Sequence, residues 1–302
     1  MKIRIGVGPV PERLADPVQD DLVTDLEARG IDSFWLSDLV SSPETVDPLI
    51  GIAHAAGRTR RLKLGTSVLV LPGRNPAVVA AQLASLAALA PGRVLPVFGV
   101  RAARPADRPV YAVSRGSRAR VFEEAVRVVR ALLTEPVVSY AGEFFQLDAA
   151  SVAPLPPKPL DLWLSGRAPA GMDRVGRLGD GWLGSAVTPV EAGACRAHIL
   201  AAADRAGRAI EDDHYGTYLT VVTEDADQRA VDALLARLHE DRPEVGDPRT
   251  LLCWGWSDAR AQLRRFVDVG LSKFVIRPAG TVTSRTEFLD ALTAELLPLQ
   301  NY

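Results

Sequence analysis

The sequence predicts an α/β fold in which eight parallel strands, each followed by a helix, close into a (β/α)8 TIM barrel. Short apolar runs alternate eight times with helical segments along the 302 residues, which is the pattern of βαβ units around a parallel sheet. A doubly wound sheet is the alternative, and it normally has a GxGxxG motif after its first strand. Here Gly6-Val7-Gly8 is followed by Pro9-Val10-Pro11, so the third glycine is missing. We therefore expect one barrel domain over residues 1–302.

The strand–helix unit around which the rest is organised lies in residues 61–91. Residues 62–71 form a nearly continuous apolar run, which suits a strand that is buried on both faces of a parallel sheet. Asn75 is a favourable N-cap and Pro76 occupies the first helical position, so a helix is expected from there to Ala90.

The other strands are short apolar runs such as SFWLS, DLWLS and KFVIR. They are expected at residues 2–7, 33–37, 94–99, 161–165, 181–183, 215–222 and 273–277. Pro96 lies inside the fourth strand and predicts a bulge or bend there, because proline has no N–H to donate to a neighbouring strand. A small hairpin is expected at residues 137–147 around Ala141-Gly142.

The other helices are recognised by capping residues and first-position prolines. They are expected at residues 16–30, 47–59, 117–133, 169–178, 188–207, 225–239, 258–269 and 284–297. Their starts are marked by Asp16-Pro17, Asp47-Pro48, Ser117, Pro169, Thr188-Pro189, Asp225, Asp258 and Ser284. Residues 101–115 and 240–256 are expected to be irregular loops.

Composition excludes several classes of protein. The net charge of −2 gives no basis for binding nucleic acid or an anionic membrane. Cys195 and Cys253 are the only cysteines, which argues against a disulfide framework and favours a reducing, cytoplasmic location. The first residues predict a strand rather than an apolar leader, and the longest apolar helix is too short to cross a membrane.

The helix at residues 76–90 has almost no polar face. Gln82 and Ser85 are its only polar side chains after the cap. Because a helix that is apolar on all sides is buried on all sides, one side should cover the sheet and the other a second copy of the chain. We therefore expect a homodimer.

In a barrel, functional residues lie where the strands end and the following loops begin. Those positions are Gly8, Asp38, Ser67-Val68, Gly99 with Arg101, Ser165 to Ala168, Gly184-Ser185 and Arg277. The segment Ser165-Gly166-Arg167-Ala168-Pro169 joins a strand to a helix start and offers backbone N–H groups, a hydroxyl and a guanidinium, which favours a phosphate site. The alternative is an ordinary turn with a solvated arginine. For Asp38 the alternative is a helix or loop cap.

Metal and hydrolase chemistry find little support. Cys195 and His198 lie three apart, but two ligands without a third do not make a metal site, and the four histidines form no metal-binding pattern. Residues 65–69 begin like a nucleophile elbow, but Leu69 stands where the motif requires glycine.

Several segments together resemble the luciferase-like flavin and deazaflavin oxidoreductases, in particular the actinobacterial branch that uses coenzyme F420. These segments are residues 31–38, 47–89, 92–100, 142–147, 160–185 and 268–278. The resemblance implies a bacterial-luciferase-like barrel with an insertion near strand seven and a non-prolyl cis peptide at Ser67-Val68 against the coenzyme ring. It also implies that the phosphate-bearing tail lies at Ser165, Gly166, Arg167 and Ala168, with Gly184 and Ser185 from the next strand. Asp38 matches a position that contacts the deazaflavin or its substrate, and Gly8 and Gly99 complete the expected cofactor contacts.

One departure from this family concerns proton transfer. Many members that use F420 have an Asp-His pair at the end of strand two, where this chain has Asp38-Leu39. The expected acid–base residues are therefore Asp38 and Arg101, with Tyr111 as a further candidate, or hydride delivery alone. Apolar residues expected to wall the pocket are Trp35, Leu39, Leu69, Phe98 and Val100.

The expected function is that of an oxidoreductase. The coenzyme would exchange a hydride at C5 with an unsaturated or carbonyl small molecule. A luciferase-like monooxygenase that uses reduced FMN and oxygen is the first alternative, and a non-catalytic flavin-binding protein is the second.

Overall fold

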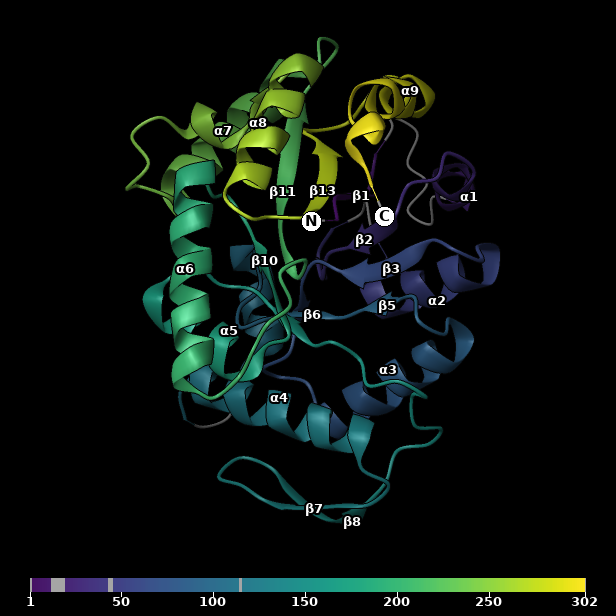
Figure 1. The fold of residues 1–302 in the computed structure, drawn as a ribbon, viewed down its shortest axis with the longest axis vertical. Helices are drawn as coiled ribbons and strands as arrows, with labels where there is room; N and C mark the ends of the chain where they lie inside the picture. The colour runs from purple at the N-terminus through teal and green to yellow at the C-terminus, as the bar shows by residue number, and fades with distance from the viewer. Residues whose placement is uncertain (1, 12–19, 43–45, 114–115, 302) are drawn as a thin grey trace.

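The expected barrel is present in the structure, a computed structural model that describes residues 2–11, 20–42, 46–113 and 116–301 (Figure 1). Its strands are β1 (Arg4–Val7), β2 (Ser33–Leu36), β3 (Lys63–Thr66), β4 (Leu69–Val70), β5 (Val94–Leu95), β6 (Val97–Gly99), β9 (Trp163–Leu164), β10 (Gly181–Gly184), β11 (Tyr215–Val222) and β13 (Lys273–Pro278). They pair in parallel in the order β4-β6-β9-β10-β11-β13-β1-β2-β3-β5. Because β3 and β4 lie on one expected strand, and β5 and β6 on another, the pairs β3–β5 and β4–β6 close the ring.

Two of the expected strands are each divided into two short ones. The strand expected at residues 62–71 is interrupted at Ser67-Val68, where the peptide bond is cis, as the resemblance implied. The strand at residues 94–99 is interrupted at Pro96, which confirms the predicted bend.

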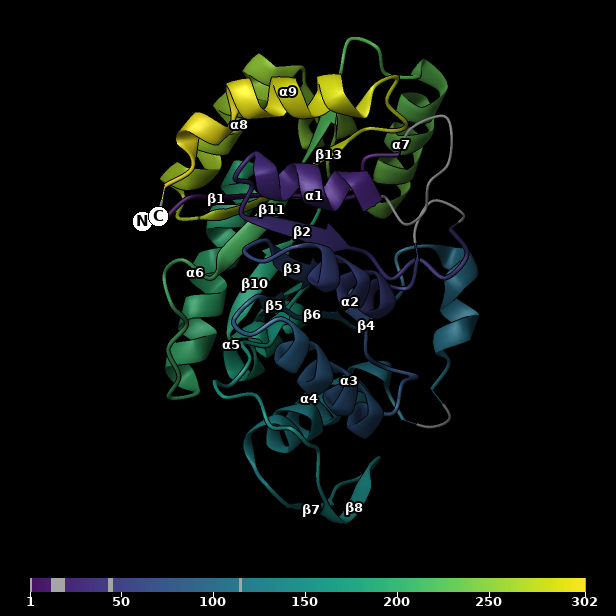
Figure 2. The ribbon, with the colours of Figure 1, turned by 90° about the vertical axis from the view of Figure 1, so that its right-hand side faces the viewer.

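Helices cover the outside of the barrel (Figure 2). They are α1 (Asp20–Ala28), α2 (Pro48–Arg58), α3 (Pro76–Leu89), α4 (Arg118–Thr134), α5 (Pro169–Leu178), α6 (Pro189–Arg205), α7 (Gln228–Asp241), α8 (Trp256–Asp268) and α9 (Arg285–Glu295). The predicted caps accept backbone N–H groups at Asp47, Asn75, Ser117, Thr188 and Ser284. The expected start of the first helix at Asp16-Pro17 lies outside the described residues. None of the described helices is both long and apolar enough to cross a membrane.

The predicted start of the seventh helix is wrong. Asp227, not Asp225, caps α7 by accepting the N–H of Arg229. The carboxylate of Asp225 instead accepts the N–H of Thr283, which lies far along the chain, so a tertiary contact decides between two possible caps. The eighth helix likewise begins earlier than predicted, at Trp256.

The two expected loops contain regular structure. The first contains the 3-10 helix η1 (Pro105–Tyr111). The second contains the 3-10 helix η2 (Pro248–Leu251) and the strand β12 (Cys253–Trp254), which pairs in parallel with β11. With α7, these elements form the insertion after strand seven that the resemblance implied. The predicted hairpin is present as β7 (Val138–Ala141) and β8 (Gln146–Ala150), and η3 (Leu297–Leu299) ends the fold.

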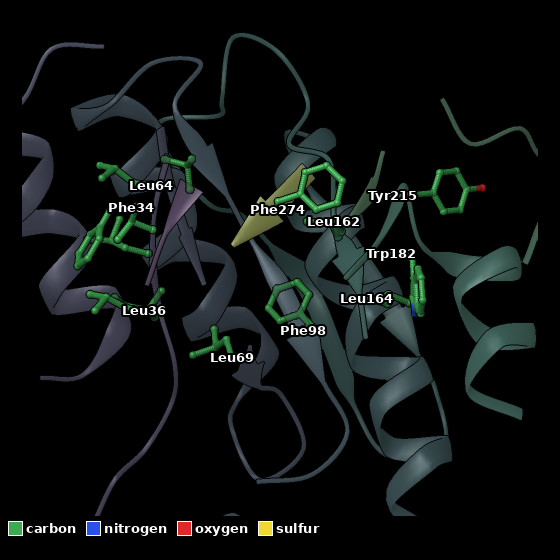
Figure 3. Close-up of a cluster of buried hydrophobic side chains, with 14 of the residues drawn as sticks. Phe34, Leu36, Leu64, Leu69, Phe98, Leu162, Leu164, Trp182, Tyr215 and Phe274 are labelled. Carbon is green, nitrogen blue, oxygen red and sulfur yellow. The ribbon is translucent and has the colours of Figure 1, made fainter. Parts of the chain in front are cut away.

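Side chains of the strands form two buried layers. The outer layer packs between barrel and helices and includes Phe34, Leu36, Leu64, Leu69, Phe98, Leu164 and Phe274 (Figure 3). The inner layer fills the barrel with Trp35, Val97, Trp163, Leu183 and Val275. The indole of Trp35 fits because neighbouring strands carry glycine, since a Cβ at Gly65 would overlap its six-membered ring. The barrel is therefore a filled core rather than a pore.

At the amino ends of the strands, Asp32 joins three cations. Its carboxylate lies 3.3 Å from Arg4 Nη1, Lys63 Nζ and Lys273 Nζ. Burial raises the pKa of Asp32, but Lys273, Lys63 and Arg4 outweigh this effect and hold the pKa below its usual value. Residues at this end of a barrel serve stability rather than chemistry.

Replacing Asp32 with asparagine should lower the free energy of unfolding by about 2 kcal/mol at neutral pH, because the three cations lose a charged acceptor. The folded-state pKa lies below the unfolded value of about 3.9, so this stabilisation is complete above that pH and is lost as the pH falls through the folded-state pKa. Urea unfolding of wild type and variant at neutral and acidic pH checks this. The difference between their free energies of unfolding should narrow as the pH falls below the unfolded value of about 3.9, and a difference that does not change with pH would contradict the assignment.

Candidate active site

The inward faces of β11 and β13 carry polar side chains toward the carboxyl end of the barrel. Along β13, alternate residues share one face, namely Lys273, Val275 and Arg277. Their register partners on β11 are Gly216, Tyr218 and Thr220. Lys273 pairs with Asp32 at the amino end of the strands, and Val275 packs in the inner layer. Arg277 is therefore the residue of the three nearest the carboxyl end of the barrel, where barrel enzymes have their active sites.

The carbonyl of Ser67 lies where side chains from three strands converge. Tyr218 Oη donates to it at 2.5 Å from across the barrel, and Ser37 Oγ donates to it at 2.9 Å from the end of β2. Val68 packs against the inner layer, and a Cβ at Gly99 would overlap its side chain. The expected site residues Ser67, Val68 and Gly99 are therefore brought together.

Arg277 is held on one side only. Its Nε donates to Thr220 Oγ1 at 2.9 Å, and its guanidinium carbon lies 4.7 Å from the centre of the Tyr218 ring. Gly8 faces it, since a Cβ there would lie 3.6 Å from the Cβ of Arg277. Burial lowers the pKa of this guanidinium, Tyr218 raises it, and the positive charge of Arg237 on α7 lowers it further.

Asp38 lies in a buried polar cluster away from the inward face. Its Oδ1 accepts the hydroxyl of Tyr111 at 2.5 Å, and its Oδ2 accepts the N–H of Val70 and Nη2 of Arg74, both at 3.0 Å. Burial, followed by Asp38, raises the pKa of Tyr111, so its hydroxyl keeps its proton at neutral pH. Both carboxylate oxygens are satisfied, which favours the cap-like role for Asp38 over proton transfer. Ser37, one residue earlier, is the residue whose side chain reaches Ser67.

The remaining acid–base candidates do not converge with Asp38. Arg101 is exposed and has no hydrogen bond or ion pair within the described part of the chain. The hydroxyl of Tyr111 donates a hydrogen bond to Asp38, and Leu39 is half-buried and has no polar group in its side chain. The expected proton-transfer residues are thus either committed to each other or open to solvent.

The predicted phosphate loop joins β9 to α5. Gly166 has a φ of 148°, and a Cβ there would lie 3.3 Å from the Cα of Gly171. The indole N–H of Trp182 donates to the carbonyl of Gly166 at 2.8 Å, which fixes the loop against β10. Ala168 is the cap residue and offers no side-chain acceptor, so the N–H of Ala170 has no partner among the described residues. A helix start of this kind attracts anions.

Two expected members of the phosphate site differ in their surroundings. Arg167 is exposed, and its Nη2 donates to the carbonyl of Asp241 at the end of α7 at 2.7 Å. Ser185 follows Gly184, the last residue of β10. A Cβ added at Gly184 would overlap the ring of Trp182. Trp182 therefore brings the Gly166 and Gly184 segments together, as expected, while Arg167 is turned toward the insertion.

Two predicted pocket walls are wrong, and two polar residues were missed. Leu69 and Phe98 are fully buried in the outer layer and face the helices, because alternation along the strands turns them away from the barrel interior (Figure 3). Tyr218 and Ser37 were not predicted. The available signal was the same alternation, since Ser37 lies two residues after the inward-facing Trp35.

Comparison with known proteins adds to this geometry. Residues 11–266 match a family model described as luciferase-like monooxygenase. An F420-dependent glucose-6-phosphate dehydrogenase from Kineococcus radiotolerans is 27% identical over 98% of this chain and 97% of its own length. A protein with the same name from Intrasporangium calvum is 27% identical over 90% of this chain and 91% of its own.

Solved structures share the fold. An F420-dependent secondary alcohol dehydrogenase in complex with an F420-acetone adduct superposes with a TM-score of 0.84 at 20% identity, covering 100% of both chains. The monooxygenase RslO1 from Streptomyces bottropensis superposes with a TM-score of 0.78 at 19% identity, covering 98% of this chain and 99% of its own. At these identities the likeness concerns the barrel alone.

Proposed function

Because this chain belongs to the luciferase-like monooxygenase family, we propose that it is an oxidoreductase that transfers a hydride between coenzyme F420 and a small organic substrate. The observation that carries this proposal is the similarity to F420-dependent dehydrogenases over 98% of the chain. That similarity favours an enzyme over a non-catalytic flavin-binding protein.

The residues at the carboxyl end of the barrel fit such a coenzyme. The free N–H of Ala170 at the start of α5, and the absence of a side chain at Gly166, suit the phosphate of its tail. Ser67, Val68, Gly99 and Gly8 would flank the ring system, and Ser165, Ala168, Gly184 and Ser185 would surround the tail. Arg167 would have to leave the carbonyl of Asp241 to reach it. When bound, the coenzyme supplies the hydride, and the protein supplies position and the exclusion of water.

The FMN monooxygenase is the less favoured alternative. Monooxygenases occur among the structures with the same barrel, but those likenesses are at 14–19% identity and concern the fold. Three relatives that match this chain over nine tenths or more of its length are named as F420-dependent.

Titration with oxidised F420 and with FMN, followed by quenching of the fluorescence of the five tryptophans, tests the proposal. F420 should bind with a dissociation constant at least about tenfold lower than that of FMN, a difference of about 1.4 kcal/mol. A preference for FMN would move the chemistry toward oxygen activation, and binding of neither would contradict the proposed function.

The same titration with a deazaflavin that lacks the phosphate tail is the matched control. Its affinity should fall well below that of F420, because the contacts at Gly166 to Ala170 would be lost. Equal affinity for both compounds would mean that the phosphate loop has been assigned to the wrong segment.

We also propose a homodimer formed through α3. Val78 and Leu89 on its outer side are 54% and 64% exposed, and Ile50 on the neighbouring α2 is 66% exposed. Sedimentation should give about twice the 32.4 kDa of one chain, and Leu89→Glu should shift it toward the monomer. Val137→Glu, at an exposed apolar position just before β7 and outside α2 and α3, should not. A wild-type mass of one chain would remove the dimer.

A further inference from the structure

The guanidinium of Arg277 is anchored and still has free donors. Thr220 and Tyr218 hold its Nε and its face, while neither terminal nitrogen has a partner within the described part of the chain. It is half-buried on the inward face of the barrel, above the filled inner layer. A side chain held in this way can present two N–H donors at the carboxyl end of the barrel without further ordering.

The charge of Arg277 is not compensated. Three other half-buried or buried cations have carboxylate partners, namely Arg74 with Asp38, Lys273 with Asp32, and Arg242 with Glu191 and Glu244. No carboxylate is paired with Arg277 among the described residues, and the charged group that acts on it is another arginine, Arg237 of α7. A partly desolvated cation beside a second cation favours an anionic or negatively polarised partner from outside the protein.

The other polar groups at this end of the barrel are less suited to stabilise charge. Both oxygens of Asp38 already accept hydrogen bonds. The hydroxyl of Tyr111 donates its hydrogen bond to Asp38, and the hydroxyl of Tyr218 donates its hydrogen bond to the carbonyl of Ser67. Leu39, at the position where the resemblance implied histidine, has no proton to offer.

Building on the proposed function, we propose that Arg277 is the catalytic residue that binds the substrate oxygen on which negative charge develops, and that Thr220 and Tyr218 are its positioning residues. The substrate class is then a ketone, an aldehyde or a conjugated carbonyl compound. Hydride adds to the carbonyl carbon, or to the β-carbon of a conjugated carbonyl compound, and an electron pair moves onto oxygen as the alkoxide or the enolate, where the N–H groups of Arg277 stabilise it. Arg277 keeps its own protons, so solvent water supplies the proton, which completes an alcohol from the alkoxide or adds to the α-carbon of the enolate to give the saturated carbonyl compound.

Kinetics with reduced F420 and 2-cyclohexen-1-one as the probe tests this role. Arg277→Gln should lower kcat/KM by about 10²–10³-fold, the usual effect of removing a donor to a developing oxyanion. Its dissociation constant for oxidised F420 should stay within about twofold of the wild-type value, because the residue is assigned to the substrate. Arg277→Lys should be intermediate, since it keeps the charge but loses the contacts with Thr220 and Tyr218. Thr220→Val should lower kcat by about tenfold with little change in KM.

Acetate binding gives a readout that does not need turnover. Acetate carries a negatively charged oxygen like the one that develops on the substrate during hydride transfer. It should therefore raise the melting temperature of wild-type protein without coenzyme, and this shift should be absent in Arg277→Gln. Arg229→Gln removes one exposed positive charge from the same helix as Arg237 and should keep the shift. Equal acetate shifts in wild type and Arg277→Gln, or unchanged turnover of the probe, would overturn the proposal. Failure of F420 to bind the wild-type protein and all of the variants would instead overturn the proposed function.

Discussion

Replacing Asp38 with alanine should lower the free energy of unfolding by about 3–5 kcal/mol, because it removes one member of a buried charged network. The guanidinium of Arg74, the hydroxyl of Tyr111 and the N–H of Val70 would all lose their shared acceptor. The side chain of Asp38 is only 2% exposed, so water cannot replace it without rearrangement. Urea denaturation followed by tryptophan fluorescence measures the effect.

Two further variants separate this structural role from proton transfer. Tyr111→Phe removes one of the three donors and should cost about 1–2 kcal/mol, and it should cost much less when Asp38 is already alanine. Asp38→Asn keeps the shape and an acceptor, so it should retain more stability than Asp38→Ala. An Asp38→Ala protein with wild-type stability and no turnover would show that Asp38 transfers protons, against the role favoured by its contacts.

Helix starts could be predicted because their signals are local. Asn75, Ser117 and Thr188 bind N–H groups within three residues of themselves, so a short sequence window contains the whole interaction. The α7 start failed because Asp225 and Asp227 are both suitable caps, and the N–H of Thr283 engages the first of them. Sequence alone does not show which of two equivalent side chains a distant segment will bind.

Barrel closure was predictable from the eightfold alternation, but the interruptions of its strands were only partly so. The bend at Pro96 could be predicted, because proline lacks the backbone N–H that a strand donates to its neighbour. No local rule marks Ser67-Val68, which was expected only from the resemblance and is cis in the structure.

Sequence alone indicated which loops form the candidate site, but not which side chains in those loops point into it. The fold fixes which residues follow the strands, so Ser67, Val68, Gly99 and Gly166 could be placed in the candidate site by position alone. Which neighbour points inward depends on an alternation that a shift of one residue reverses, and this is why Asp38 was favoured where Ser37 makes the contact. The partnership of Asp38 and Tyr111 spans 73 residues of sequence and has no local signal.

Gly65→Ala should lower the free energy of unfolding by about 1–3 kcal/mol, the usual cost of overpacking a filled core. The added Cβ would overlap the ring of Trp35, which is fully buried in the inner layer of the barrel. Gly57→Ala is the matched control, because this exposed glycine in α2 has nothing within 4 Å of a new Cβ. That change should instead stabilise the protein by about 0.5–1 kcal/mol, so the same chemical substitution gives opposite signs. Chemical denaturation midpoints report both effects.

A double-mutant cycle then tests whether Trp35 is the cause. In a Trp35→Phe background the benzo ring that meets Gly65 is absent, so Gly65→Ala should cost clearly less than in wild type. An equal cost in both backgrounds would assign the effect to the backbone of β3 instead. The distinction bears on function, because the layer that contains Trp35 and Val275 packs against Tyr218, and Arg277 is the next inward-facing residue after Val275 on β13. A shift of the inner layer would move the ring of Tyr218, against which the Arg277 guanidinium packs. A purely local change in β3 would leave that ring in place.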